Sequence, residues 1–166
     1  MEEILKQMPK VELHLHLDGS ISPKLASKLS GLSEEFVKEK MIAPDKCKNL
    51  SDYLTKFDFP ISLMQTKENL CLIAKDLVER LAEENVIYAE IRFAPMFHTK
   101  MGLTMDEVVE AVLDGLHQNK KVKTNLILCL MRGMREEDNE KTILVAEKYL
   151  NKGVCAIDLA GAEDKY

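Results

Sequence analysis

The feature that most constrains the fold is the segment from Val11 to Leu17, in which Val and Leu alternate strictly with Glu and His. This period of two predicts a β-strand, because successive side chains of a strand point to opposite faces. The Val and Leu side chains share one face, which we expect to pack against helices. Glu12, His14 and His16 share the other face, which should then point to the interior of a barrel or to a second layer.

His14 and His16 are candidate metal ligands. Their side chains lie about 6.6 Å apart along the strand, two rises of roughly 3.3 Å, so both can reach one ion. Imidazoles on an interior face need partners, and a divalent metal suits them. The alternative is a solvated pair with no ligand. Asp18 follows in the same phase and Gly19 ends the strand, so the polar groups gather at a carboxyl end, where α/β proteins build active sites.

Composition narrows the class of protein. The 166 residues, 46% hydrophobic and 31% charged, are enough for one globular domain, which we expect to span residues 1–166. A net charge of −5 without a basic block argues against nucleic-acid binding. No apolar run approaches the ~20 residues of a membrane span, and the acidic N-terminus is unlike a signal peptide. The four Cys are far apart, which favours the reducing cytoplasm.

Segments of strand and helix periodicity alternate along the chain. The predicted strands are 11–17, 86–93, 124–131 and 154–159, and the predicted helices are about 22–30, 33–41, 51–61, 66–81, 104–118 and 138–151. Such alternation predicts right-handed crossovers and a parallel sheet, so the fold class is α/β. About four βα units leave the sheet open. If it belongs to a (β/α)8 TIM-type barrel of roughly 250 residues or more, this chain is its first half, with extra helices between strands 1 and 2.

The helical region after residue 50 has two interpretations. Tyr53, Phe57 and Phe59 make it the most aromatic stretch of the chain, and core packing is the usual reason for such a cluster. A cover over a pocket is the alternative, because these helices are longer than a minimal connection between two strands needs.

Three motifs resemble those of one known family. Residues 10–20 (Lys-Val-Glu-Leu-His-Leu-His-Leu-Asp-Gly-Ser) closely resemble the first strand of the adenosine deaminase family, residues 90–95 (Glu-Ile-Arg-Phe-Ala-Pro) its second, and residues 157–161 (Ile-Asp-Leu-Ala-Gly) its fourth. The resemblance runs from about Pro9 to Glu163. The family comprises zinc-dependent (β/α)8 barrels of the amidohydrolase type that deaminate adenosine, AMP or adenine. The resemblance therefore implies the N-terminal half of such an enzyme, acting on adenosine to give inosine and ammonia.

The resemblance also implies residue roles. His14 and His16 would be ligands of Zn²⁺, Asp18 would accept a hydrogen bond from the 5′-hydroxyl of the ribose, and the backbone of Gly161 would approach the purine. The residues that match the apolar cover over the ribose pocket, which supports the lid interpretation, are Leu50, Tyr53, Leu54 and Phe57. Met131 matches a position in the pocket wall. Asp158 lies in the matching strand, but we assign it no direct role in the reaction.

Catalytic groups are expected outside this chain, downstream of Tyr166. In the family, the third His, the metal-binding Asp, the acidic Glu and a further His come from the fifth strand onward, in a His-Ala-Gly-Glu run, a later His and an Asp-Asp pair. None of these runs occurs here. His98, in a predicted loop, and His117, near the end of a predicted helix, are poor substitutes. We therefore expect no catalytic residue in this chain and no useful turnover by it alone.

The expected function is that of the N-terminal portion of an adenosine deaminase. Asp18 favours a nucleoside substrate, since the related adenine deaminases tend to carry Glu at this place. The alternatives are a deaminase of adenine, AMP or a modified adenosine, and a catalytically inactive half-barrel that serves as a binding module. A half-barrel exposes two sheet edges. The expected partners are a small purine nucleoside and either the missing C-terminal half or a second chain at those edges.

Overall fold

The computed structural model of the chain describes residues 2–44, 46–47 and 49–162. Its strands, β1 (Lys10–His16), β2 (Val86–Phe93), β3 (Lys123–Met131) and β4 (Val154–Ala160), form one sheet in the order β1-β2-β3-β4. Every neighbouring pair in this sheet is parallel. The predicted parallel sheet is therefore confirmed. Three strands differ from their predicted bounds by one residue at one or both ends: β1 spans 10–16 because Leu17 already caps a 3₁₀ helix, β3 begins at Lys123 and β4 ends at Ala160.

Two positions named from the sequence lie outside the described residues. They are Glu163, where the family resemblance ends, and Tyr166, beyond which the catalytic residues are expected. The expectation that catalytic groups follow Tyr166 is therefore not tested by the structure and stays a prediction.

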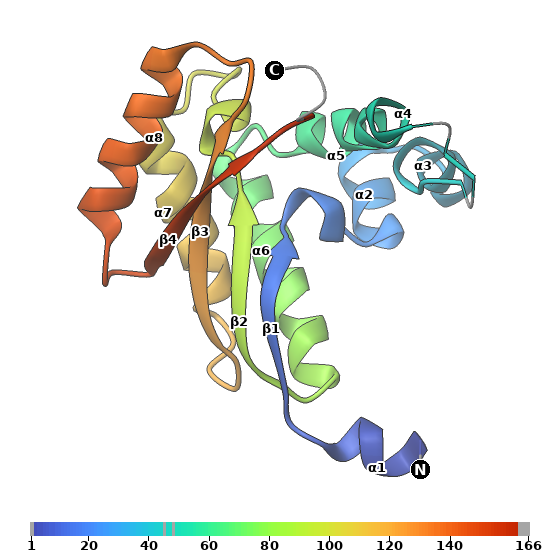
Figure 1. Cartoon of the computed structure of the whole chain (residues 1–166). Helices are drawn as coiled ribbons and strands as arrows, with labels where there is room; N and C mark the ends of the chain where they lie inside the picture. The colour runs from blue at the N-terminus through green and yellow to red at the C-terminus, as the bar shows by residue number, and fades with distance from the viewer. Residues whose placement is uncertain (1, 45, 48, 163–166) are drawn as a thin grey trace.

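Apart from α1, the helices lie on one face of the sheet or beyond its carboxyl edge (Figure 1). α1 (Glu2–Gln7) precedes β1, and β1 is followed by η1 (Asp18–Ser20), α2 (Pro23–Ser30), α3 (Glu34–Met41), α4 (Leu50–Leu54), η2 (Thr55–Phe57), α5 (Asp58–Leu63) and α6 (Lys67–Glu83). η3 (Pro95–His98) and α7 (Met105–Leu116) precede β3, and α8 (Glu136–Tyr149) precedes β4. In Figure 1, α6 and α7 lie behind the sheet, α8 lies at the left against β3 and β4, and α2 to α5 gather beyond the end of β1. None of the described helices is long and apolar enough to cross a membrane.

Local sequence signals set several helix ends. The Ser22 hydroxyl accepts a hydrogen bond from the backbone N–H of Leu25, and Gly31 ends the same helix at a φ of 72°. Thr104 and Glu107 form the capping box that their spacing predicts. The predicted helix over 51–61 is instead broken into α4, η2 and α5. Pro60 lies in the first turn of α5, where its missing N–H breaks no intrahelical bond.

The core lies between the sheet and the helices behind it. Many of its fully buried side chains come from α6, α7, β2 and β3, including Leu70, Ile73, Leu77, Ile91, Phe93, Leu116, Leu126 and Leu128. α6 and α7 approach closely at Gly115, where an added Cβ would lie 2.2 Å from the carbonyl oxygen of Cys71. Glycine permits this contact because it has no side chain.

The predicted apolar face of the first strand is only partly covered. Leu17 is fully buried, but Val11 and Leu13 are each 56% exposed. At the opposite end of the sheet, Ile157 and Leu159 are 44% and 50% exposed. These side chains belong to β1 and β4, the two edge strands, and within the described ranges no further strand pairs with either edge. The expectation that helices cover this whole face of β1 is therefore wrong for Val11 and Leu13.

Candidate functional site

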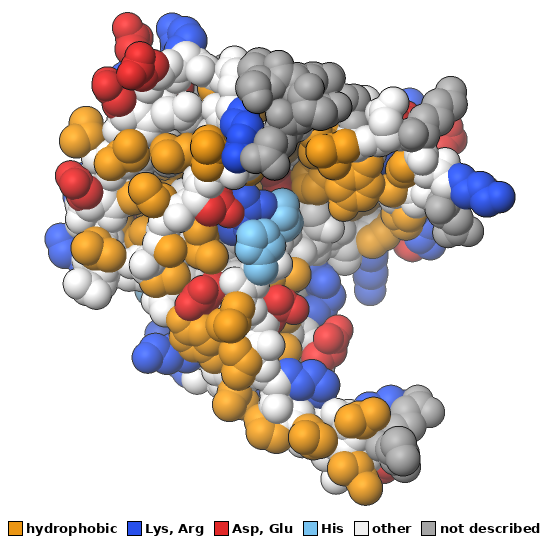
Figure 2. All heavy atoms as spheres, in the orientation of Figure 1, with side chains coloured by type: hydrophobic (Ala, Val, Ile, Leu, Met, Phe, Trp, Pro, Cys, Tyr) orange, Lys and Arg blue, Asp and Glu red, His pale blue; other side chains and the backbone are white. Residues whose placement is uncertain are grey.

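A pocket of about 510 Å³ is lined by side chains from the carboxyl halves of all four strands. The sheet lines it with His14, His16, Arg92, Cys129, Met131 and Asp158, and the helices beyond β1 line it with Leu50, Leu54, Phe57, Asp58 and Ile61. Figure 2 shows histidine side chains at the centre of the face in view, with basic and acidic side chains beside them and a hydrophobic patch on the helical region.

His14 and His16 lie side by side, as the period of two predicts. Their ring centroids are 5.6 Å apart, with the planes tilted by 59°. Burial, together with the smaller effects of the Arg92 and His14 charges, lowers the pKa of His16 to about 4, against an opposing effect of Asp158. The ring is therefore neutral near pH 7, which is the form that binds a metal.

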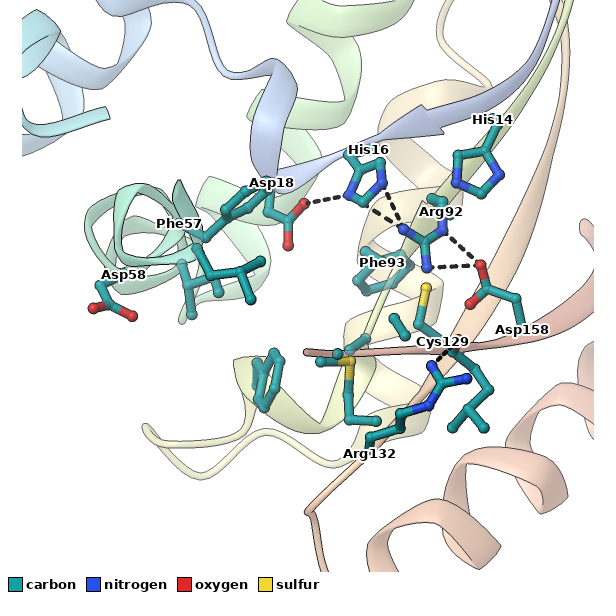
Figure 3. Close-up of a pocket in the computed structure, with 18 of the residues that line it drawn as sticks. His14, His16, Asp18, Phe57, Asp58, Arg92, Phe93, Cys129, Arg132 and Asp158 are labelled. Atoms are coloured by element: carbon teal, nitrogen blue, oxygen red, sulfur yellow. Dashed lines mark hydrogen bonds and ion pairs between the residues drawn. The ribbon is translucent and has the colours of Figure 1, made fainter. Parts of the chain in front are cut away.

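A partly buried ion pair between Arg92 and Asp158 lies in the pocket (Figure 3). The Nε and Nη2 atoms of Arg92 lie 2.7 Å and 2.6 Å from Oδ2 of Asp158. Nη1 lies 2.5 Å from Nε2 of His16, which is the neighbour of Arg92 in the register of β1 and β2. Burial alone would raise the pKa of Asp158, but hydrogen bonds from Arg92 and the Cys129 thiol, with the charge of Arg92, hold it below its usual range.

Reasoning from the sequence missed this pair. The sequence motifs assign no role to Arg92 and no direct chemistry to Asp158. A signal was available, because Arg92 lies two and four positions after Glu90 and Tyr88, polar side chains on one face of a strand whose other face is apolar. In a parallel sheet that polar face is the one that also carries His16.

Asp18 is placed in the pocket by η1. It is buried, its Oδ1 accepts a hydrogen bond of 2.9 Å from the backbone N–H of Gly19, and the same oxygen lies 3.8 Å from Nδ1 of His16. Burial raises the pKa of Asp18 to about 6, against the smaller opposing effects of backbone hydrogen bonds and Arg92. The carboxylate is therefore ionised near pH 7 and can accept a hydrogen bond from a ligand.

The predicted lid residues separate into two groups. Leu50, Leu54 and Phe57 line the pocket, and the ring centroid of Phe57 is 6.0 Å from that of His16. Tyr53 is absent from the lining of this pocket and instead lines a neighbouring cavity of about 130 Å³. Its ring meets Phe57 edge-on at 5.7 Å, so it supports a lining residue.

Gly161 and Met131 both line the pocket wall. Gly161 has a φ of +113°, and an added Cβ would lie 3.2 Å from the Cβ of Arg132. Only glycine adopts this conformation without strain. The structure therefore places the backbone of Gly161 at the cavity, as a close approach to a ligand requires.

The donor set fits part of a zinc site. Two imidazoles lie together, and Oδ1 of Asp158 is buried without a hydrogen-bond partner among the described residues. Such donors suit a divalent cation. Over residues 2–44, 46–47 and 49–162, however, no three His, Cys, Asp or Glu side chains are grouped so that they could hold a metal.

The other two histidines lie away from the pocket. His98 is in η3 rather than in a loop, is fully buried, and its Nδ1 lies 3.1 Å from the carbonyl oxygen of Met64. His117 is exposed just after α7. Neither residue is among those that line the pocket in the described structure.

Comparison with known proteins gives consistent matches. The sequence model of the family described as "Adenosine deaminase" matches residues 9–166. An adenosine deaminase from Enterococcus faecalis is 42% identical over 172 residues, covering 98% of this chain and 51% of the relative. The chain therefore spans about half the length of the curated relatives that it matches.

Solved structures that match also align with nearly the whole of this chain and with about half of their own chain. An Arabidopsis N6-mAMP deaminase aligns with a TM-score of 0.80 and 28% identity, covering 98% of this chain and 53% of its own. An amidohydrolase from Burkholderia ambifaria with bound Zn aligns with a TM-score of 0.84 over 98% of this chain and 46% of its own. Its identity is 19%, so this match shows the fold alone. The predicted fold class, the first half of a TIM-type barrel, is confirmed.

Proposed function

Because this chain belongs to the adenosine deaminase family, whose model matches residues 9–166, we propose that it is the N-terminal half of a zinc-dependent hydrolase that converts adenosine to inosine and ammonia. The observation that carries the proposal is the pair of imidazoles, His14 and His16, with ring centroids 5.6 Å apart in a pocket with an apolar wall. These two residues would hold the metal. Zinc, when bound, supplies a water-derived nucleophile at neutral pH.

The substrate residues follow from the same pocket. Asp18, ionised near neutral pH, would accept a hydrogen bond from the 5′-hydroxyl of the ribose. Gly161 would let the purine approach the backbone, and Met131 would form part of the wall. Leu50, Leu54 and Phe57 would cover the ribose and exclude water, with Tyr53 packed against Phe57.

This chain supplies only part of the catalytic machinery. No Glu is among the residues of the described structure that line the pocket, so a general acid would come from elsewhere, from a segment downstream of Tyr166. The open edges at β1 and β4 are where the strands of the missing half, or of a second chain, would pair. We further propose that residues 1–166 act as a single domain. The four free cysteines support a cytoplasmic location.

A nucleotide is the second candidate substrate. The N6-mAMP deaminase from Arabidopsis matches the fold over 98% of this chain. Arg132 lines the pocket and could contact a phosphate, whereas the carboxylates of Asp18 and Asp58 line the same pocket and would oppose one. The balance of these charges favours the uncharged nucleoside.

The proposal is tested by ammonia release from the complete protein, this chain together with the rest of the barrel, in the presence of zinc. The substrates are adenosine, adenine, AMP and N6-methyl-AMP. We expect adenosine to have the highest kcat/KM. Preferential turnover of AMP or N6-methyl-AMP would mean that the substrate is a nucleotide and not adenosine. Ammonia release from none of the four would favour the inactive binding module instead.

Asp18→Ala tests the ribose contact. It should raise KM for adenosine at least tenfold, about 1.4 kcal/mol, with a smaller effect on adenine, which has no ribose. Equal effects on both substrates would contradict the assigned role. The isolated chain should release no ammonia under the same conditions, and turnover by it would contradict its proposed incompleteness.

A further inference from the structure

The guanidinium of Arg92 lies against the ring of His16 (Figure 3). Its Nη1 is 2.5 Å from Nε2 and 3.3 Å from Nδ1 of that ring. A guanidinium carries donors only, so the ring nitrogen is the acceptor. Whichever ring nitrogen were to bind a metal, the Arg92 cation would therefore lie beside it.

Arg92 is held from its other side by Asp158. Nε and Nη2 both donate to Oδ2, at 2.7 Å and 2.6 Å, while the Arg92 side chain is only 7% exposed. A buried cation needs a counter-ion, and Asp158 is that counter-ion. The contact with the neutral ring of His16 is therefore one that Arg92 can give up while it keeps its charge paired.

We propose that Arg92 competes with a metal for His16, so that zinc binds only when the guanidinium leaves His16 and remains on Asp158. This inference rests on the zinc site of the proposed function. Arg92 is a positioning residue, because it acts on the metal through His16 and sets the affinity of the site for zinc.

Two physical effects predict that Arg92 lowers the affinity of the site for zinc. Zinc binding has to break the hydrogen bond between Arg92 and His16, and it brings a dication close to a guanidinium in a partly buried site where solvent and salt screen poorly. Both effects weaken binding. Removal of the guanidinium should therefore strengthen the binding of zinc, although it removes a polar contact from a histidine ligand.

The test is the zinc affinity of this chain, measured with Zn²⁺ alone by competition with a chromophoric chelator at neutral pH. Arg92→Met keeps an extended side chain without the charge, and we expect it to bind zinc at least about tenfold more tightly than the wild-type chain. The matched control is Arg132→Met. Arg132 lines the same pocket but donates to the carbonyl oxygen of Leu159, and its loss should change the affinity less than about threefold.

The variants His14→Ala and His16→Ala distinguish a failure of the proposed zinc site from a failure of the inference about Arg92. If zinc binding is independent of both histidines, or no variant binds zinc, the zinc site of the proposed function fails and this inference falls with it. If binding requires both histidines but Arg92→Met binds no more tightly than the wild type, only this inference is overturned.

Arg92→Met leaves Asp158 without its counter-ion, so a second measurement uses the unaltered chain. Side-chain ¹⁵N resonances of Arg and His are followed by NMR during a zinc titration. We expect the Arg92 and His16 signals to shift together and to reach saturation at the same zinc concentration. An Arg92 signal that stays unchanged while His16 saturates would overturn the inference, because it would mean that the guanidinium does not move away from the ring.

Discussion

The side chain of Asn139 hydrogen-bonds both backbone groups of Met131. Its Oδ1 accepts from the N–H of Met131 at 2.9 Å, and its Nδ2 donates to the carbonyl oxygen of Met131 at 3.1 Å. The first residue lies in α8 and the second is the last residue of β3. This contact therefore ties the crossover helix to the point where the strand enters the pocket wall.

Asn139→Leu should lower the free energy of unfolding by about 2–3 kcal/mol, because it removes two hydrogen bonds and leaves half-buried backbone groups without partners. Urea denaturation measures the change. Glu140→Leu, at the exposed neighbouring position, is the control and should change stability by less than about 0.5 kcal/mol. Similar losses in both variants would mean that the contact with Met131 has no special role.

Gly115→Ala should destabilise the chain, although helix propensity alone predicts a gain of about 1 kcal/mol. The new Cβ would lie 2.2 Å from the Cys71 carbonyl oxygen and 2.7 Å from the Cβ of Ala74, so α6 and α7 would have to move apart. The expected loss is about 1–3 kcal/mol, measured by thermal or urea unfolding. Asp114→Ala, at an exposed position of the same helix, should be neutral or slightly stabilising. A stabilised Gly115→Ala variant would refute the close packing.

Stability should fall as the pH decreases from about 6.5 to 4 because of His98. Burial lowers the pKa of His98 from the ordinary 6.5 to about 4, partly offset by its hydrogen bond to Met64. In this pH range the unfolded chain therefore binds a proton that the folded chain does not. The free energy of unfolding should fall by up to about 3 kcal/mol on acidification.

The pH effect is isolated by comparing the wild type with His98→Gln. The free energy of unfolding of the variant should be lower at neutral pH and should depend less on pH between about 6.5 and 4. Other groups that titrate in this range, including His16 and Asp18, are present in both proteins and cancel in the difference. Parallel pH profiles would show that His98 does not supply the dependence.

The open edge at β1 should make the isolated chain associate as its concentration rises. Leu13 is 56% exposed on this edge strand. Leu13→Lys should shift the chain toward the monomer, because a charged side chain on an edge strand disfavours pairing with another chain. Sedimentation velocity over a range of concentrations measures this. Leu144→Lys, at a 63% exposed position of helix α8 rather than of an edge strand, should leave the association unchanged. An equal effect of both variants would indicate non-specific association.

The sequence by itself determined the features that depend on near neighbours in the chain. The alternation from Val11 to Leu17 predicted a strand with both histidines on one face, and their rings do lie together. Val86–Phe93 is a strand with the predicted bounds, and Thr104 begins its helix as its spacing from Glu107 requires. These features follow from backbone geometry and short-range hydrogen bonds, which a few consecutive residues specify.

Only the tertiary structure decided which groups meet across the sheet. The register of β1 and β2 sets His16 beside Arg92, and Arg92 reaches Asp158 across 66 positions of sequence. The same long-range packing buries His98 and leaves Leu13 exposed at an open edge. A period in the sequence fixes the face on which a side chain lies, but not what lies opposite that face. The partner of each polar group in the pocket is therefore a property of strand register and chain closure, which no local pattern specifies.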